Sequence, residues 1–570
     1  MTATRPRPSS HWRQRGSAAG KFITLILVAG LIAMGIYLVR QDLGGATGPQ
    51  PTAAQSQQPD APLVVDGEAP TPAEPVTGLP TLAAAAPYLP KGNVIEIDIS
   101  EYAGYGGLIV ANGGLEPNPD SFFARNYGFQ VKLVLSEEES WSKLNNGQVA
   151  ASVTTADTLA VMGRQLDVVV PAQISFSRGA DQLVVDTGIA NINALRGKVL
   201  AAAQFNESEF FIRYLTQEAG IPITILRDLD GRPAPGSLGL VFYDDAFLAC
   251  DAYGHELASG NNRLNGCVGW SPRTEEVVAA SGGRAKMLVS NRNLLIIADL
   301  LMVNKGFANA HPKWVTGLVH GLLEGNRLLS ADPAAHSATV ARALGWGAAE
   351  TLTELTKVHL SNLPENLAFF EGTIDAAGSY SGIFQSSVLA YGNLIKNPAD
   401  PARYLDLSHL QALAKAGHYK DARIAIAPIR TGGGVQLEGD ALLSRDIRFF
   451  FEPNSSRLDS KASENLGYLE TIKGYLQVSP GSVVLLRGHV DNARVAEFER
   501  QGGQAMVRSM ALKAMELSRQ RADAVKAALL LRYPNIDASR VEVVGRGWEE
   551  PSGGDSDANR RVEVQWFTLE

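Results

Sequence analysis

The sequence predicts an α/β protein of several domains, preceded by one transmembrane helix. Three observations indicate this arrangement. A basic N-terminus leads into a continuous apolar stretch at 22–39. Alternating strand and helix patterns then occupy residues 93–400. Finally, Val483 to Ala522 has the pattern of a buried strand, a loop and a helix. A length of 570 residues accommodates several domains of ordinary size.

The N-terminus predicts a signal anchor. Residues 1–21 carry basic side chains before any acidic one, at Arg5, Arg7, Arg13, Arg15 and Lys21. Residues 22–39 are long enough to cross a bilayer as a helix, and the positive-inside rule places the basic tail in the cytoplasm. We therefore expect a single-pass protein of a Gram-negative inner membrane, with most of the chain in the periplasm. The alternative, a cleaved signal peptide, normally has a shorter apolar core and a small-residue cleavage site.

Residues 40–92 are predicted to be a disordered tether. They are rich in Pro, Ala, Gln and Thr and show no apolar periodicity. Such a composition buries too little apolar surface to offset the chain entropy lost on folding. The domains beyond it would then stand away from the membrane.

Residues 93–400 are predicted to form an α/β domain with parallel sheets. Apolar strand patterns alternate with helix patterns at 208–219, 275–280 and 313–328. Four segments resemble periplasmic solute-binding proteins of the NMT1, alkanesulfonate, taurine or nitrate type: Asn145–Ala160, Ala194–Ala202, Gly269–Pro272 and Met302–Val315. The resemblance implies two lobes joined by crossing strands, with a ligand cleft between them.

By position, several polar residues and one tryptophan are candidates for that cleft. They follow strands or begin helices, where backbone N–H groups are free to bind a ligand. Together with an arginine they suit a small anion such as a carboxylate, sulfonate or phosphate. The alternative is that they are ordinary caps, turns and packing residues. The candidates are Asn112, Gly113, Thr154, Thr155, Ser177, Arg178, Asn206, Ser208 and Trp270.

The chain has two cysteines, Cys250 and Cys267. Two cysteines are too few for a disulfide-rich scaffold or a cysteine-based zinc site. In an oxidising compartment they would close one short loop. Two free buried thiols are the alternative.

Residues 401–444 are predicted to be a connector with one helix, and residues 445–570 a small α/β domain. Strands are expected at Ile447–Phe451 and, centrally, at Val483–Leu486, and an amphipathic helix bears Leu466, Leu469, Ile472 and Leu476. We expect Ser518 to cap a helix that has Arg521 in its first turn.

Four blocks in this region resemble, in their order, the peptidoglycan-binding domain of OmpA, MotB and Pal. They are GHVD (488–491), LSRQRA (517–522), GRGWEEP (545–551) and NRRVEV (559–564). The resemblance implies that Asp491 takes the ammonium and Arg521 the carboxylate of diaminopimelate in the stem peptide. An additional segment near 495–516 predicts extra helix, and a domain that has kept this fold but lost the ligand is the alternative.

Composition and motifs exclude several other classes of function. The formal net charge is −8 and no basic stripe follows the N-terminus, so we expect no nucleic-acid partner. The sequence lacks a phosphate-binding loop, an HExxH pair, a GxSxG elbow and a Cys–His metal pattern. We therefore expect neither an enzyme nor a metal or other cofactor.

Together these features predict a membrane-anchored envelope protein that binds peptidoglycan and a small solute, for which an anion is the expected class. A further membrane or envelope protein is an expected partner. The alternative is a purely structural tether, or a stator-like scaffold, whose receptor domain binds nothing. Ion-driven torque is disfavoured because residues 22–39 contain no acidic residue.

Overall fold

The computed structural model of the chain describes residues 68–136, 140–292, 294–373, 378–426, 442–452, 455–459, 461–479, 481–551 and 559–567. The basic tail (1–21), the predicted membrane span (22–39) and the first part of the predicted tether lie outside these ranges. Across the ranges that are described, no helix has both the length and the apolar composition needed to cross a membrane.

The first lobe is built on a six-stranded sheet in the order β12-β4-β11-β3-β1-β2. Its strands are β1 (Val94–Ile99), β2 (Gln130–Leu135), β3 (Ala151–Thr155), β4 (Val168–Ser177), β11 (Ala298–Asn304) and β12 (Val358–Leu360). The prediction of parallel sheets is wrong for part of this sheet: β1 runs parallel to β2 and β3, whereas β11 runs antiparallel to β3 and β4. The reason is that β11 returns from the second lobe.

Helices and short 3₁₀ turns complete the first lobe; besides η1, these turns are η2 (Gly163–Gln165), η4 (Gly392–Leu394) and η5 (Pro401–Tyr404). The predicted helix at 313–328 is confirmed as α10, which packs closely on α2 through facing glycines: a Cβ added to Gly325 would lie 1.9 Å from the Gly107 carbonyl oxygen. The elements are η1 (Ala103–Tyr105), α2 (Gly106–Asn112), α3 (Phe122–Tyr127), α4 (Ser140–Asn145), α5 (Ala156–Met162), α9 (Lys305–Ala310), α10 (Pro312–Ala331), α11 (Pro333–Leu344), α12 (Ala348–Leu355), α13 (Leu363–Glu371), α14 (Tyr380–Tyr391) and α15 (Ser408–Lys415).

The second lobe has its own six-stranded sheet, in the order β10-β5-β9-β6-β8-β7. Its strands are β5 (Asp181–Asp186), β6 (Val199–Ala203), β7 (Ile223–Leu226), β8 (Leu238–Tyr243), β9 (Gly266–Trp270) and β10 (Ala285–Ser290). Its helices α6 (Glu207–Glu218) and α8 (Arg273–Ala280) confirm two sequence predictions, and α7 (Ala246–Ser259) carries Cys250. Cys250 and Cys267 form a disulfide that joins α7 to β9, with 5.1 Å between their Cα atoms.

Two chain segments cross between the lobes, after β4 and after β10. Asn291 directly follows β10, and its side chain forms hydrogen bonds with the segment that directly follows β4. Its side chain donates to the Ser177 carbonyl oxygen and to Asp181 Oδ2, and it accepts from the backbone N–H of Gly179. Asn291 is fully buried. The polar link therefore fixes the position at which one lobe gives way to the other.

Residues 68–92 correct the prediction of a disordered tether. This N-terminal strap is bonded to both lobes. On the second lobe, Val76 exchanges two hydrogen bonds with the Gln204 side chain. On the first lobe, Leu82 donates to Gln165 and Tyr88 donates to Asn304. Side-chain amides of the lobes thus supply the hydrogen bonds that the strap's Pro- and Ala-rich sequence does not make within itself.

Asn304 is the central contact between the strap and the first lobe. Its Oδ1 accepts from Tyr88 N and Phe307 N, and its Nδ2 donates to the carbonyl oxygens of Ala86 and Leu144. Replacing it by alanine leaves these buried groups without partners, so we expect Asn304→Ala to lower the free energy of unfolding by about 2 kcal/mol. Urea denaturation of the full chain measures this. Asn126→Ala, which removes one exposed hydrogen bond, is the control, and equal stability of the two variants would contradict the account.

The first part of the predicted connector belongs to the first lobe. Leu410 and Leu413 of α15 are buried, and Leu405 forms a bridge with Val170 of β4. Residues 427–441 lie outside the described ranges. The predicted end of the first domain at residue 400 is therefore too early. The short amphipathic helix α15, which was predicted as part of the connector, packs on the first lobe.

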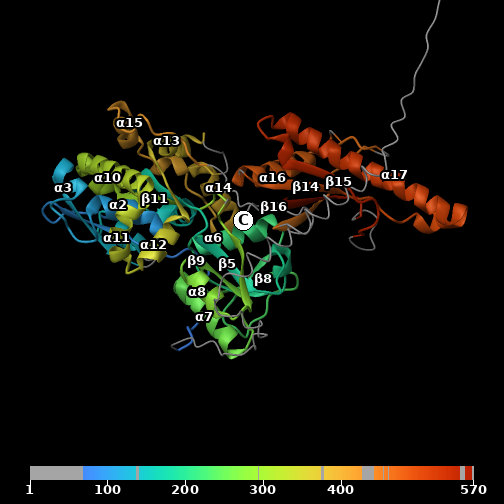
Figure 1. Cartoon of the computed structure of the whole chain (residues 1–570), viewed down its shortest axis with the longest axis horizontal. Coiled ribbons are helices and arrows are strands. Elements are labelled where there is room, and N and C mark those ends of the chain that lie inside the picture. The colour runs from blue at the N-terminus through green and yellow to red at the C-terminus, as the bar shows by residue number, and fades with distance from the viewer. Residues whose placement is uncertain are drawn as a thin grey trace, which may run out of the picture. The chain divides into compact units, whose positions relative to one another are not determined.

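The C-terminal part is a four-stranded sheet in the order β13-β16-β14-β15 with two helices (Figure 1). Its elements are β13 (Leu443–Ile447), α16 (Glu464–Val478), β14 (Val483–Gly488), α17 (Val495–Arg532), η6 (Ala538–Arg540), β15 (Val541–Gly545) and β16 (Val562–Phe567). The central strand at 483–486 is confirmed as β14. The first strand lies four residues earlier than predicted, and Leu466 is half exposed whereas Leu469, Ile472 and Leu476 are buried.

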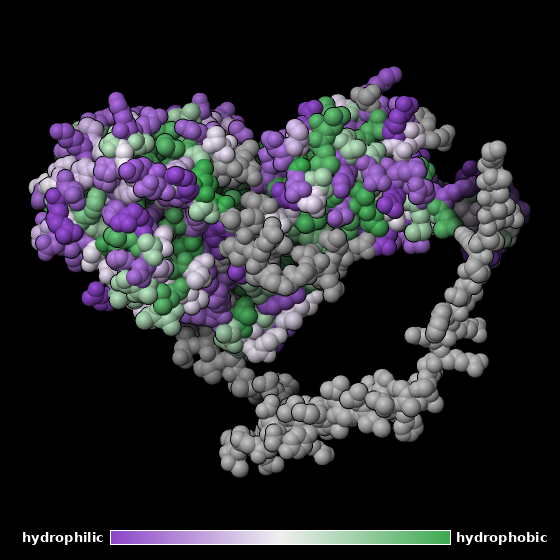
Figure 2. All heavy atoms as spheres, turned by 45° about the horizontal axis from the view of Figure 1, so that its top comes forward, coloured by the Kyte–Doolittle hydropathy of each residue, from purple (hydrophilic) through white to green (hydrophobic). Residues whose placement is uncertain are grey.

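The hydrophobic side chains are concentrated inside these units. Ile95, Ile97, Val170 and Leu240 of the lobes and Trp566 of the C-terminal sheet are completely buried. On the face shown in Figure 2, hydrophilic residues cover much of the surface and hydrophobic ones are interspersed. This distribution is the one expected of domains that fold in contact with water.

Candidate functional site

Two small cavities lie between the lobes, with volumes of about 20 and 50 Å³. Both are lined by residues from each lobe. The smaller cavity is lined by Ser100, Tyr102, Tyr105, Thr155, Ser177, Asp181, Glu207, Trp270, Ile297 and Asp299. The larger shares five of these and adds Ile99, Ser136, Ser140, Trp141, Val153, Thr154 and Asn206. We call this lining the cleft.

Asp299 projects into the cleft from β11. Its carboxylate accepts a hydrogen bond from Ser175 Oγ at 2.6 Å and one from the Tyr105 hydroxyl at 3.2 Å. Burial raises the pKa of Asp299 to about 8, although the hydrogen bonds from Ser175 and Tyr105 act in the opposite direction. At neutral pH this buried carboxyl group is therefore largely protonated.

Two further aspartates are buried in this region. Burial raises the pKa of Asp181, at the start of β5, although the group accepts a hydrogen bond from Asn291. Burial also raises the pKa of Asp157 in α5 to about 7. Asp157 does not line either cavity, but its charge and that of Asp181 both raise the pKa of Asp299. Several acidic side chains thus lie close together at the cleft, and each one that ionises disfavours the ionisation of the others.

The start of α6 already uses its free N–H groups within the chain. Asn206 Oδ1 accepts from Ser208 N and Glu209 N, and Glu209 Oε2 accepts from Phe205 N. Glu207 and Glu209 both lie in the first turn. These acidic side chains occupy the position at a helix N-terminus that a bound anion would otherwise take.

The structure brings five of the nine solute-site candidates to the cleft. Thr154, Thr155, Ser177, Asn206 and Trp270 line it. The other four have structural roles or lie apart from the cavities. Asn112 donates to the carbonyl oxygens of Gly114 and Glu116, Gly113 ends α2 in a left-handed conformation, Arg178 donates to Arg292 O, and Ser208 lies buried in the first turn of α6.

The sequence analysis did not identify two tyrosines and one acidic residue that line the cleft. Tyr102 and Tyr105 follow β1 directly, at the position where Asn112 was expected, because the chain turns into η1 immediately after the strand. Asp299 is a single acidic residue within the apolar run from Leu294 to Val303. An isolated acid in a buried strand is the signal that would have revealed it.

In the C-terminal domain the structure brings Asp491 and Arg521 to one site, with Arg560. Arg560 Nε lies 3.5 Å from Asp491 Oδ2. Arg521 donates to the carbonyl oxygen of Ser455 and lies 5.1 Å from the centre of the Phe451 ring. Burial lowers the pKa of Arg521, the charge of Arg560 lowers it further, and the charge of Asp491 opposes both. An acid and two guanidinium groups are thus presented together.

The expected helix start at Ser518 is wrong. Ser518 lies within α17, which begins at Val495 and bends at Gly502 and Gly503, so Arg521 is not in a first turn. The additional segment near 495–516 is helical and extends α17 backwards past Ser518. The Ser518 hydroxyl instead donates to Met515 O and accepts from Gly547 N. The site therefore depends on side-chain charge and not on a helix N-terminus.

The same domain contains a partly buried ionic cluster. His489, Glu550 and Glu563 have potential metal-ligating atoms within 4.8 Å of one another. Arg487 pairs with both carboxylates, at 2.6 Å to Glu550 and 2.7 Å to Glu563. Burial acts to raise the pKa of Glu563, but hydrogen bonds and the Arg487 charge outweigh it and lower the pKa to about 2. The arginine thus compensates the acids in the way a bound cation would.

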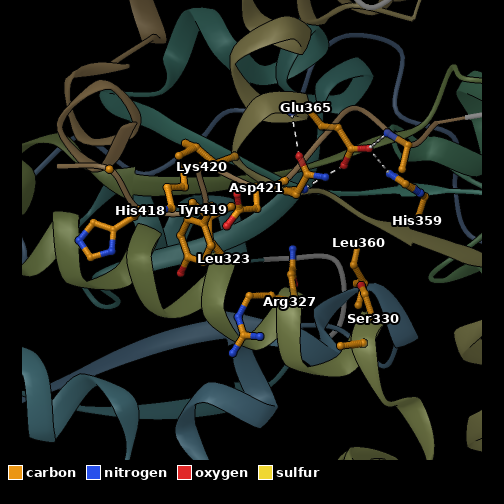
Figure 3. A pocket seen from close by; sticks show the side chains of 17 residues that line it. Leu323, Arg327, Ser330, His359, Leu360, Glu365, His418, Tyr419, Lys420 and Asp421 are labelled. Atoms are coloured by element: carbon orange, nitrogen blue, oxygen red, sulfur yellow. Dashed lines mark hydrogen bonds and ion pairs between the residues drawn. The ribbon is translucent and has the colours of Figure 1, made fainter. Parts of the chain in front are cut away.

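Another cavity, of about 690 Å³, lies on the first lobe away from the cleft (Figure 3). It is enclosed by α10, β12, the start of α13 and residues 417–425. Two of its ionisable side chains contact partners within the protein: Arg327 pairs with Glu324, and His359 contacts the buried Glu365. Glu365 also accepts from Ala425 N, so these groups hold residues 417–425 against the lobe.

Several solved structures are similar to the chain. They include the alkanesulfonate-binding protein SsuA from Xanthomonas axonopodis pv. citri bound to MOPS (13% identity, 56% of this chain and 99% of that chain, TM-score 0.42). The second is the periplasmic aliphatic sulphonate-binding protein SsuA from Escherichia coli, with 13% sequence identity and a TM-score of 0.42. The match covers 61% of this chain and 99% of that chain. The third is the periplasmic nitrate-binding protein NrtA from Synechocystis PCC 6803, with 10% sequence identity and a TM-score of 0.42. The match covers 57% of this chain and 90% of that chain.

A comparison with curated protein sequences found no match. A family model does match the C-terminal part of the chain, over residues 450–565. This range contains Asp491, Arg521 and Arg560 together with the strands β14 and β15 and the first four residues of β16. Residues 450–565 form a domain of the OmpA family.

Proposed function

We propose that the chain is an envelope protein that binds peptidoglycan through its OmpA-family domain and a small solute in the cleft between its lobes. The observation that carries the first part is the convergence of Asp491, Arg521 and Arg560 at one site. Diaminopimelate has an ammonium and a carboxylate at the end of its side chain. The carboxylate of Asp491 and the planar guanidinium of Arg521 complement these two charges.

The solute-binding part is supported by the geometry of the lobes. Two crossing segments join two separate sheets, and polar residues from both lobes meet at a pair of internal cavities. Ligand sites occur preferentially at such junctions between lobes. We expect binding without chemistry, since the sequence lacks the motifs of the common enzyme classes.

Our proposal places the protein in the inner membrane, anchored by residues 22–39, with its folded part in the periplasm. The disulfide between Cys250 and Cys267 supports an oxidising compartment. A chain held by both membrane and wall cannot shuttle solute, so a membrane or envelope protein is the expected recipient of any signal from the cleft.

The second candidate function is a structural tether between membrane and wall. It is favoured by the small volumes of the cleft cavities, about 20 and 50 Å³. A receptor binds at least one solute at the cleft, whereas a tether binds none there.

The experiment that tests wall binding is co-sedimentation of the full chain with purified sacculi. We expect saturable binding that free meso-diaminopimelate reduces in proportion to its concentration. Lysine, which keeps the side-chain ammonium but lacks the second carboxylate, is the matched competitor and should reduce binding much less. Binding that both compounds leave unchanged would show that the wall is not held through diaminopimelate.

A further inference from the structure

The charges that line the cleft are of one sign. Asp181, Glu207 and Asp299 line the smaller cavity, and neither cavity has a lysine, arginine or histidine among its described lining residues. Arg178 directly follows the lining residue Ser177 in the sequence, but its Nε donates to the carbonyl oxygen of Arg292. The lining therefore offers no counter-charge to an anion.

A second observation indicates that the cleft receives a ligand. Trp270 lines both cavities, and its indole Nε1–H has no hydrogen-bond partner although the residue is only 8% exposed. A buried donor without a partner costs free energy unless a ligand or water accepts from it. Trp270 thus marks a position for an oxygen acceptor on the ligand.

Aromatic rings complete the lining. Tyr102 and Tyr105 pack edge to face, with 5.3 Å between ring centres, and Trp141 lines the larger cavity. Aromatic faces attract organic cations, and the attraction increases when water is excluded. The acids and the rings therefore favour the same ligand charge.

We propose that the cleft binds a small organic cation, a primary ammonium that carries an oxygen acceptor: the ammonium lies against Asp181 and Asp299, and the acceptor faces Trp270. This proposal rests on the solute-binding function proposed above and replaces the anionic solute expected from sequence. Cavities of about 20 and 50 Å³ hold one and a few water molecules, so a ligand of more than a few heavy atoms enters only when the lobes separate.

The titration of the lining gives the proposal a pH dependence. The groups that face the smaller cavity are Asp181 from β5, Asp299 from β11, Glu207 from α6, and the tyrosines Tyr102 and Tyr105 after β1. Burial raises the pKa of Asp299 to about 8. A cation binds the ionised carboxylate, so its affinity should rise from pH 6 to pH 8 and its binding at pH 7 should release protons.

Isothermal titration of the full chain at pH 8 tests this, with ethanolamine and n-propylammonium as cations and with acetate and ethanesulfonate as anions of similar size. We expect saturable binding of ethanolamine, no binding of the anions, and proton release that appears as a dependence of the heat on the buffer. Affinity for ethanolamine should fall at least fivefold at pH 6.

Variants locate the site. We expect Asp299→Asn and Asp181→Asn each to weaken ethanolamine binding at least tenfold. Asp186→Asn is the matched control, because Asp186 lies at the opposite end of β5 and pairs with Tyr253 and Asn265. Trp270→Phe should weaken ethanolamine binding but leave n-propylammonium binding unchanged, since only ethanolamine has an acceptor for the indole N–H.

The outcomes separate this inference from the proposed function. Binding of the anions without the cations would overturn the inference and leave the solute receptor standing. Absence of binding by all four compounds, and by neutral compounds of similar size, would overturn both. Binding of ethanolamine with equal affinity at pH 6 and pH 8 would contradict the assignment to the buried aspartates, whether or not the variants fold.

Discussion

Replacing Arg521 by alanine is expected to weaken binding of the full chain to purified sacculi by about 100-fold, or about 2.7 kcal/mol. Asp491→Ala should have an effect of the same size. Each substitution leaves one charge of diaminopimelate without its partner in a partly buried site. Arg521→Lys keeps the charge but loses the planar, two-donor geometry, so we expect an intermediate loss.

The matched control is Arg519→Ala. Arg519 lies two residues earlier on α17, is 64% exposed and lies 3.9 Å from Asp523. We expect the Arg519→Ala variant to bind sacculi as the wild type does. Arg560→Ala, in contrast, should weaken binding because Arg560 lies beside Asp491. Equal retention of wild type, Arg519→Ala and Arg521→Ala would contradict the assignment of the wall site.

Removing the disulfide is expected to lower the free energy of unfolding of the second lobe by about 3 kcal/mol. Cys250 and Cys267 are 17 residues apart, and a bond across a loop of this length restricts the unfolded chain by about that amount. Both residues are completely buried, between α7 and β9. The measurement is guanidinium denaturation of the Cys250→Ala/Cys267→Ala chain against the oxidised wild type.

Reduction supplies the control for this comparison. Dithiothreitol present during unfolding and refolding should lower the midpoint of the wild type toward that of the double variant. It should not alter the double variant itself. A reductant-insensitive wild type with the same midpoint as the double variant would show that the bond does not contribute to stability.

Much of the fold follows from apolar patterning. The strand β14 is a short apolar run, and the helices α6, α8 and α10 follow a local pattern of period 3.6; burial reinforces each of them. The strap at 68–92 was misread because its order depends on partners far away in the chain. Gln204 and Asn304, which hold it, lie 128 and 216 residues from their partners. Composition reports only what a segment can bury by itself.

The candidate site was predictable to a different extent in each domain. Asp491 and Arg521 were found because each lies in a short local motif. The acidic lining of the cleft was not found from the sequence. It consists of Asp181, Glu207 and Asp299, which lie on three separate elements and meet only in the folded chain. Ser518 was misassigned as a cap because the helix pattern before it was taken as an insertion, whereas it continues the same helix.

The measurement that tests the central claim most directly is solute retention on protein-loaded sacculi. Sacculi loaded with the full chain are incubated with periplasmic small molecules, washed and analysed by mass spectrometry. The account predicts that at least one solute sediments with loaded sacculi, and that Arg521→Ala removes protein and solute together. Protein that sediments without enriching any solute over bare sacculi would contradict the receptor and leave a tether. Protein that does not sediment would contradict wall binding itself.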